Sequence, residues 1–403
     1  MRTNSISSLI YDSRFRGYFF QTIILLGLAA SVWWLIDNTV TNLADRGKTV
    51  GFGFLGENAG FQISATLGTW LFDYNVGQSS YLDVYFIGIT NTFLVAILGI
   101  AGATVLGFTI GIMRLSKNFI IRSFATVYIE LLRNLPLLLQ LFFWYFAVLR
   151  ALPSKRDKIE IIPDAIAMNI TGLYLPAPLV EPVFIYSAVA FIVGIIVTLI
   201  LKKWADNRQS KTGQRFPVFW TGIAIIIGLS MLTFLITGSP LSWSFPEFKT
   251  TGAILRRGFQ SGSGMVLVPE LLAVWLALTL YTAAFIAEIV RAGILAVAKG
   301  QTEAAYSIGM RPGMTLRLII IPQALRVIIP PLTSQYLNLT KNSSLAVAIA
   351  YPELVSIFAG TALNQVGKEI EMIFMMMMVY LTFSIATAAF MNWFNARVKL
   401  VER

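Results

Sequence analysis

The stretch from Gly300 to Pro331, GQTEAAYSIGMRPGMTLRLIIIPQALRVIIPP, lies between long apolar segments. Gly309 and Pro312 interrupt it, and because glycine and proline break helices, we expect two short helical pieces around a tight turn. The stretch also holds three arginines, Arg311, Arg317 and Arg326. A rigid basic elbow between membrane segments has a shape suited to contact with another protein.

The composition indicates a membrane protein with an all-α fold. Of the 403 residues, 56% are hydrophobic and only 13% are charged, whereas about 25% charged residues are usual in soluble proteins. The apolar residues fall in long blocks, which is typical of a polytopic membrane protein. The net charge of +11 fits positively charged cytoplasmic loops better than a nucleic-acid site.

The chain contains no cysteine and no histidine. Thiolate nucleophiles and cysteine-based metal sites are therefore excluded, and the commonest general base and metal ligand are missing too. We expect no catalytic residue and no metal site. Gly47-Lys48-Thr49 resembles the end of a phosphate-binding loop, but Asn42 stands where that loop needs its first glycine. We therefore predict that the chain has no nucleotide site of its own.

About eight segments approach or exceed the roughly 20 apolar residues that cross a bilayer. They are residues 18–36, 84–113, 119–150, 183–201, 217–237, 265–291, 325–348 and 372–398. Pro136 predicts a kink near the middle of the third segment, and Pro330-Pro331 predict a disturbance at the start of the seventh.

Lysine and arginine predict the orientation, because cytoplasmic loops carry an excess of both. Basic residues flank alternate ends of the segments: Arg2, Arg14, Arg16; Arg114, Lys117, Arg122; Lys202, Lys203, Arg208, Lys211, Arg215; the elbow; and Arg397, Lys399, Arg403. Both termini and the elbow are then cytoplasmic. Two loops placed outside run against the rule, with Lys155, Arg156 and Lys158 in one and Arg256 and Arg257 in the other.

The elbow carries a spaced motif that resembles the EAA loop of ABC importer permeases. It reads Glu303-Ala304-Ala305, three residues, Gly309, nine residues, Ile319, one residue, Ile321-Pro322. The family usually ends the motif with Leu-Pro. The surrounding stretches 88–115, 128–146, 281–305 and 337–354 resemble the polar-amino-acid branch of the same family, which also contains the histidine and glutamine permeases.

This resemblance implies a type I, MetI-like core of five helices, with one N-terminal and two inserted helices added. The expected division is residues 1–83, an N-terminal helix and periplasmic loop; 84–150, the first part of the core; 151–264, an insertion; and 265–403, the second part, with the coupling loop at 300–325. The outward segments 37–83 and 151–182 are expected to be ordered caps or surface-lying pieces rather than independent soluble domains. Residues 42–63 resemble the long Q-type permease of general L-amino-acid or glutamate/glutamine/aspartate/asparagine importers.

The resemblance also implies the partners and the location. It implies a second related permease, a dimer of ATP-binding subunits that holds ATP and Mg²⁺, and a periplasmic amino-acid-binding protein. The chain itself would carry no cofactor and would lie in the bacterial inner membrane. Its expected function is to move L-amino acids, acidic, amide or of a broad range, from periplasm to cytoplasm by alternating access.

The expected contact with the ATPase comprises Glu303, Ala304, Ala305, Gly309, Arg311 and Pro322. Glu303 offers hydrogen-bond acceptors, and the small residues permit close approach. An ordinary interfacial helix is the competing interpretation.

Polar and ionisable residues inside the spans are the candidates for the substrate path, because they are costly there. Lys341 would attract a substrate carboxylate, with Asn342, Ser343 and Ser344 beside it, although a lysine that extends to the membrane surface is an equal alternative. Asn91, Thr92 and Gln140 either line the path or bond neighbouring helices.

Two pairs are gate or ion-pair candidates, Glu130 with Arg133 and Glu288 with Arg291, each spaced i and i+3. Structural pairing near an inner gate is the favoured interpretation of both, and substrate contact is the second. An ion- or proton-coupled secondary transporter that works alone is the alternative function, although it leaves the elbow motif unexplained.

Overall fold

A computed structural model of the protein describes residues 13–45, 51–251, 257–260 and 262–398. Within them, seven helices are long and apolar enough to cross a membrane, or eight if a sharply bent pair counts as one span. The seven are α2 (Ser13–Asp45), α4 (Tyr81–Arg114), α7 (Ile185–Thr212), α8 (Val218–Ile236), α9 (Pro269–Leu295), α12 (Ile321–Asn342) and α14 (Glu369–Val398). The all-α membrane fold with about eight spans is therefore confirmed.

Some predictions fall on residues outside the described ranges. These residues are Arg2, Gly47-Lys48-Thr49, Arg256, Lys399 and Arg403.

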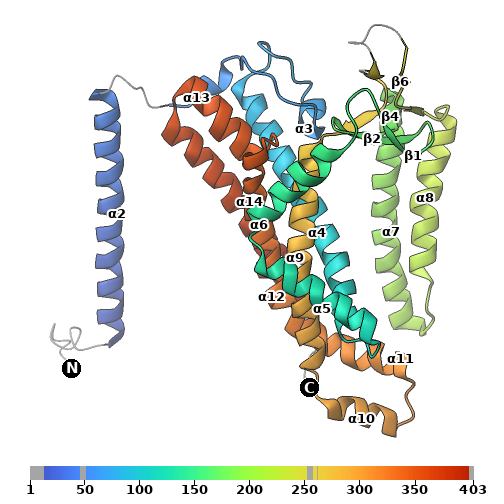
Figure 1. Ribbon diagram of the computed structural model, residues 1–403. Helices are drawn as coiled ribbons and strands as arrows, with labels where there is room; N and C mark the ends of the chain where they lie inside the picture. Colours follow the sequence, from blue (N-terminus) through green and yellow to red (C-terminus); the bar gives the residue numbers. More distant parts are fainter. Residues whose placement is uncertain (1–12, 46–50, 252–256, 261, 399–403) are drawn as a thin grey trace, which may run out of the picture.

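The core is organised around α9, which lies between α4 and α12 (Figure 1). In its most apolar stretch 61% of the residues are buried, against 33% for α4 and 28% for the span that contains α12. Buried alanines such as Ala273, Ala277 and Ala283 occupy much of its surface. Small side chains let neighbouring backbones approach closely, and this is how helices associate where no water drives them together.

The closest contact in the core joins α4 to α9 at two glycines. A Cβ atom on Gly107 would lie 2.6 Å from the Cβ of Ile286, and one on Gly111 would lie 2.7 Å from the carbonyl oxygen of Ala287. Neither distance is compatible with a real side chain. A spacing of four residues between glycines is typical of close helix packing, and here the neighbouring helix is α9.

The third predicted span is not a continuous kinked helix but two helical pieces that meet at 106°. The first is α5 (Phe119–Asn134), and the second consists of α6 (Leu137–Phe142), the π-helical turn η2 (Phe143–Val148) and the 3-10 turn η3 (Leu149–Ala151). Leu135 and Pro136 both have extended ψ angles, 131° and 135°. Because proline disfavours helical geometry at the preceding residue, the chain turns there instead of bending gradually.

The seventh span also differs from the prediction. α12 begins at Ile321, and Pro330 and Pro331 lie inside the continuous helix rather than at a disturbed start. The irregular turns are found at its two ends: a π-helical turn η6 (Leu316–Ile320) precedes it and a 3-10 turn η7 (Ser343–Ile349) follows it.

A second apolar cluster closes one end of the bundle. It joins the start of α4 to α14 and to the π-helix η8 (Val355–Ala362), which continues into α13 (Leu363–Val366). Residues 51–80 cover this end with a 3-10 turn η1 (Gly53–Gly56) and a short helix α3 (Leu67–Leu71). Phe54 is buried in the cluster, against Tyr81. Residues 51–80 are thus an ordered cap, whereas residues 37–45 of the same predicted segment belong to α2.

Eight short strands, which the sequence analysis did not predict, lie among the described residues between η3 and α9. β1 (Ile159–Ile162), β2 (Ile166–Asn169), β3 (Gly172–Leu175) and β8 (Met265–Leu267) form one antiparallel sheet in that order. β4 (Ala177–Val180) pairs with β5 (Leu241–Ser244), and β6 (Phe248–Lys249) pairs with β7 (Gly258–Phe259). We call this group of strands and their connections the outer cap.

The helices α7 and α8 form a hairpin below the outer cap, entered through the 3-10 turn η4 (Pro182–Phe184) (Figure 1). The pair packs through small residues: a Cβ on Gly222 would lie 2.5 Å from the Cγ2 of Thr198. Helix α2 stands apart from the other helices, and none of its apolar stretch is buried.

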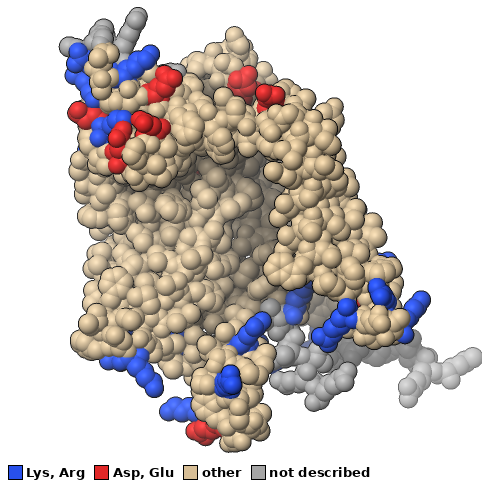
Figure 2. Space-filling model, turned by 90° about the vertical axis from the view of Figure 1, so that its right-hand side faces the viewer, with Lys and Arg blue, Asp and Glu red and all other residues tan. Residues whose placement is uncertain are grey.

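Figure 2 shows how charge is divided along the molecule. Lysine and arginine gather at the end where α10 (Lys299–Ser307) projects, residues of both signs gather at the opposite end, and a broad uncharged band lies between them. An uncharged band bounded by polar ends is the surface that a bilayer requires.

The contact of α4 with α9 gives a first testable prediction. Gly107→Val forces the two helices apart, and overpacking of this kind costs about 1–3 kcal/mol. The thermal midpoint of the purified protein in detergent should fall. The control is Gly228→Val in α8, where an added Cβ meets nothing within 4 Å. Equal midpoints for the two variants would contradict the packing described for Gly107.

Candidate functional site

The elbow begins with the nine-residue helix α10, which follows α9 after three residues. The short helix α11 (Pro312–Thr315) then leads through η6 into α12. The prediction of two short helical pieces around a turn is confirmed. The amide of Gln323 donates to Gln301 at 3.3 Å and so links α12 back to α10.

Gly309 makes the turn between the two pieces. Its φ is +78°, in the left-handed region that glycine tolerates best. Its N–H bonds the carbonyl of Tyr306, and the N–H of Met310 bonds the carbonyl of Ala305. These two bonds form a Schellman motif, which satisfies carbonyls at the end of α10. The glycine of the motif is therefore required by backbone geometry, whatever binds the elbow.

The elbow presents a surface without a partner inside the described chain. Ala305 is buried and holds α10 against its own chain, whereas Glu303, Ala304 and Arg311 are exposed. Several apolar side chains beside them are also exposed, among them Ile308 (77%), Leu318 (59%) and Tyr306 (50%). A mixed polar and apolar surface of this kind on a projecting helix is typical of protein contact sites.

A network of charges lies at the end of the bundle nearest the elbow. Glu288 of α9 accepts from Arg291 at 2.6 Å, so the predicted Glu288–Arg291 pair is confirmed. Glu288 also forms a close ion pair with Arg114 of α4. Arg114 in turn contacts Glu130 of α5 at 3.2 Å. The network therefore joins three helices close to the point where α9 leads into α10.

The second predicted pair, Glu130 with Arg133, was wrong. Glu130 bonds Arg114, and the guanidinium of Arg133 lies 5.2 Å from the ring centroid of Phe285 on α9. The spacing i and i+3 puts both side chains on one face of α5, but Arg114 on the neighbouring helix competes for the carboxylate. Arg133 is exposed and forms no ion pair within the described residues.

A polar cavity of about 230 Å³ lies between α9 and α12. Its lining consists of Tyr281, Thr282, Phe285, Gln335, Asn338 and Asn342. The three amides occupy positions i, i+3 and i+7 of α12, which share one face of a helix. Amide, hydroxyl and aromatic groups together can bond both a carboxylate and an ammonium group.

Of the four predicted residues from Lys341 to Ser344, only Asn342 lines this cavity. Lys341 is exposed at the end of α12. The hydroxyl of Ser343 donates to the carbonyl of Thr340 at 2.7 Å, and that of Ser344 donates to the carbonyl of Lys341 at 2.8 Å. Both serines thus satisfy carbonyls where the α-helix changes into a 3-10 turn.

Asn91 and Gln140 make contacts that brace the fold. Asn91 is buried, and its amide nitrogen donates to Thr66 and to the carbonyl of Pro352, while its oxygen accepts from Gly68. Gln140 donates to two carbonyls, those of Leu132 and Leu135, beside the break between α5 and α6.

Thr92 has a similar position on α4. Its hydroxyl donates to Gly88 and accepts from the N–H of Leu354. Asn91 and Thr92 together hold the connection between η7 and η8 against α4.

Sequence reasoning missed Gln335 and Asn338, although their helical spacing with Asn342 was a usable signal. It also missed Glu353, which is fully buried in the connection between η7 and η8. Its carboxylate accepts from the N–H groups of Val355 and Ser356 at 2.9 and 2.8 Å and from the hydroxyl of Tyr380 at 3.2 Å. An acidic residue at the start of a helix is a recognisable capping signal.

Burial dominates the titration of Glu353 and raises its pKa to about 7, although the two N–H groups and Tyr380 act in the opposite direction. A carboxyl with a raised pKa stabilises the folded state fully at low pH, and this stabilisation is lost as pH rises through the folded-state pKa.

The chain is thus a polytopic membrane protein in which one central helix connects a polar cavity to an exposed elbow. Comparison with known families identifies the class of membrane protein. The pattern of the family described as "Binding-protein-dependent transport system inner membrane component" matches residues 103–400. The chain belongs to this family of ABC importer permeases, and within it to the amino-acid permeases.

Three relatives match almost the whole chain. The general L-amino acid transport system permease protein AapQ of Rhizobium johnstonii is 46% identical, covering 99% of this chain and 96% of the relative. The putative amino-acid ABC transporter permease protein YhdX of Escherichia coli is 49% identical, covering 96% of this chain and 95% of the relative. The glutamate/glutamine/aspartate/asparagine transport system permease protein BztB of Rhodobacter capsulatus is 37% identical, covering 99% of this chain and 97% of the relative.

The raised pKa of Glu353 predicts a pH-dependent stability. Between pH 6 and pH 8 the folded state should lose about 1 kcal/mol as this carboxyl ionises. The thermal midpoint of the protein in detergent should therefore be lower at the higher pH. In Glu353→Gln, which keeps hydrogen-bonding groups but does not titrate, this difference should shrink. The same pH dependence in both proteins would exclude Glu353 as its source.

Proposed function

We propose that this permease subunit imports L-amino acids by alternating access, driven by a separate ATPase that contacts the elbow. The observation that carries the proposal is the continuity of α9, which lines the polar cavity and leads within four residues into the exposed helix α10. Relatives named for general L-amino-acid and for glutamate, glutamine, aspartate and asparagine transport support an acidic, amide or broad substrate range.

The elbow end is proposed to face the cytoplasm, with both termini on the same side. The lysines and arginines gathered at that end support this orientation (Figure 2). Helix α2 starts, and α14 runs, toward the elbow end of the molecule (Figure 1). ATP and Mg²⁺ would be bound by the ATPase subunits, and a periplasmic binding protein would deliver the amino acid.

The elbow has two connections to the transport path. α10 leads back to α9 along the chain and contacts the start of α12 through Gln301 and Gln323. Both helices line the polar cavity. A movement of α10 imposed by a partner is therefore transmitted to both walls of the cavity. Glu303, Ala304 and Gly309, with Arg311 and Pro322, would form the contact with the ATPase.

The polar cavity is proposed as part of the amino-acid path, with the other part supplied by a second, related permease. Arg133 is well placed to attract a substrate carboxylate, because its guanidinium lies against Phe285, which lines the cavity. Lys341 is the second cation proposed for this role, and neither Arg133 nor Lys341 belongs to the cavity lining itself. Glu130 and Glu288, held by arginines, would serve as structural ties near the inner gate.

A secondary transporter that works alone is not favoured. Such a transporter would leave the exposed elbow without a role, and the chain belongs to a family of binding-protein-dependent permeases.

The contact with the ATPase is tested by Glu303→Lys. Reversal of the charge on the exposed elbow should prevent co-purification of the ATPase subunit and abolish ATP-driven uptake. The control is Glu181→Lys, the same change at an exposed residue at the start of the α7–α8 hairpin. Uptake that continues in Glu303→Lys, or that is driven by an ion gradient without ATP, would refute the proposed function.

The path is tested by comparing Arg133→Gln with Lys341→Ala. If Arg133 attracts the carboxylate, its loss should raise the KM for uptake about tenfold, the size expected when one charge-assisted hydrogen bond is lost. Lys341→Ala should have a smaller effect, and the assembled complex should be recovered in both cases. Unchanged kinetics in both variants would exclude a carboxylate-binding role for either cation.

A further inference from the structure

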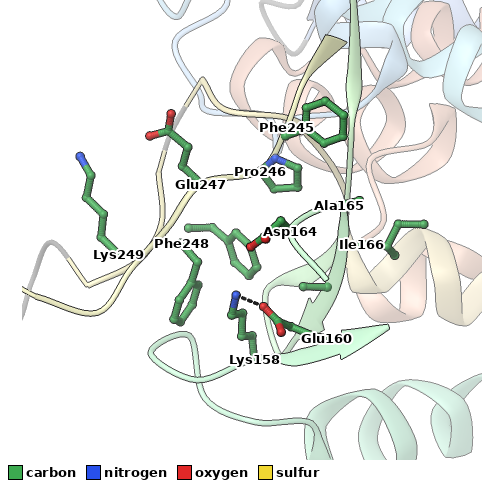
Figure 3. Close-up of a pocket in the computed structure, with 12 residues that line it drawn as sticks. Lys158, Glu160, Asp164, Ala165, Ile166, Phe245, Pro246, Glu247, Phe248 and Lys249 are labelled. Atoms are coloured by element: carbon green, nitrogen blue, oxygen red, sulfur yellow. Dashed lines mark hydrogen bonds and ion pairs between the residues drawn. The ribbon is translucent and has the colours of Figure 1, made fainter. Parts of the chain in front are cut away.

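The outer cap contains an open groove of about 420 Å³. Two segments distant in the sequence form its walls, residues 158–167 around the β1–β2 turn and residues 245–249 with Phe259 (Figure 3). We propose that this groove is the surface on which the periplasmic amino-acid-binding protein docks. The proposal rests on the proposed function and on the orientation that places the outer cap in the periplasm.

The rim of the groove carries charges of both signs. Lys158 and Lys249 supply positive charge, and Glu160, Asp164 and Glu247 supply negative charge. Lys158 forms an ion pair with Glu160, while Glu247 and Lys249 are exposed on the opposite wall. Charges of both signs arranged around a surface favour one orientation of a protein partner and reject others.

The floor of the groove is aromatic. The ring centroids of Phe248 and Phe259 lie 4.9 Å apart. The Phe259 ring stacks on the Tyr174 ring, with 3.6 Å between their centroids. The ammonium of Lys158 lies 5.0 Å from the centroid of Phe248. Phe245, at the edge, is 52% exposed. Aromatic side chains surrounded by a charged rim are typical of the residues that dominate protein contacts.

A protein fits this groove better than a free amino acid does. Sites for small ligands usually enclose most of the ligand's surface. This groove is open, and Glu247 and Lys249 on one wall are exposed, as expected for a surface that receives one protruding part of a larger partner. The printed description of the family, "Binding-protein-dependent", supplies a partner of the required kind.

The groove is connected to the transport path through one β-sheet. Tyr174 belongs to β3, and it pairs with Val266 of β8. β8 ends at Leu267, and α9 begins at Pro269. A contact on the aromatic floor therefore reaches, through one sheet, the helix that lines the polar cavity and leads to the elbow.

The test uses the complete complex of both permeases and the ATPase in lipid nanodiscs. The purified amino-acid-binding protein of the same importer is titrated into it, empty or with L-glutamate or L-glutamine. Two variants change exposed side chains of the groove: Phe245→Ser, and the double variant Glu247→Lys with Lys249→Glu, which keeps the net charge. Glu181→Lys, outside the groove lining, is the control. ATP hydrolysis is measured with and without the binding protein.

If the binding protein docks in the groove, both groove variants should need a higher concentration of it for half-maximal stimulation of ATP hydrolysis than the unmodified complex. The increase should be at least about tenfold, as expected for the loss of contacts at the centre of an interface. Basal ATP hydrolysis and the behaviour of Glu181→Lys should stay unchanged. A shift below about twofold in both groove variants, with normal stimulation of the unmodified complex, would overturn the docking proposal alone.

Two other outcomes would also overturn it. If the binding protein does not stimulate the unmodified complex at all, the proposed function fails together with the docking. If L-glutamate binds the complex in the absence of the binding protein, and Phe245→Ser abolishes that binding, the groove is an amino-acid site instead.

Discussion

The close approach of α4 and α9 is the contact on which the rest of the structure depends. Gly107 and Gly111 let the two backbones meet, and no side chain larger than hydrogen fits at either position. Helices in a bilayer gain little from apolar burial alone, so association relies on such close packing. It holds α9 at the centre of the bundle, where α12 and α5 also pack against it. The Arg114–Glu288 pair fastens the same two helices beside the elbow.

The sequence predicted the features that depend on composition and on local spacing. Apolar length located the spans, and the spacing from Glu303 to Pro322 located the elbow. Gly309 adopts the left-handed turn that this spacing required. The pair Glu288–Arg291 formed because both partners lie on one helix and their geometry follows from the i and i+3 spacing.

Features that depend on contacts between distant segments could not be predicted in this way. Glu130 has a potential partner on its own helix, but the nearer partner in space is Arg114 on another. The strands of the outer cap are two to four residues long, too short for a periodic pattern to emerge. The polarity of Asn91 within a span allowed either a path residue or a bond between helices, and only the contact with Pro352 shows that it braces that loop.

The two helices that line the polar cavity differ in regularity, and the difference bears on how the cavity can open. α9 is a regular α-helix of 27 residues, about 40 Å long. α12 lies between a π-helical turn and a 3-10 turn, and two prolines remove backbone donors from its middle. Hydrogen bonds in such turns are weaker and more easily exchanged than those of an α-helix. We therefore expect a displacement of the elbow to move α9 as a unit, while the angle of α12 changes at its irregular ends. In the proposed transport cycle, the difference between these two responses would open or close the cavity between them.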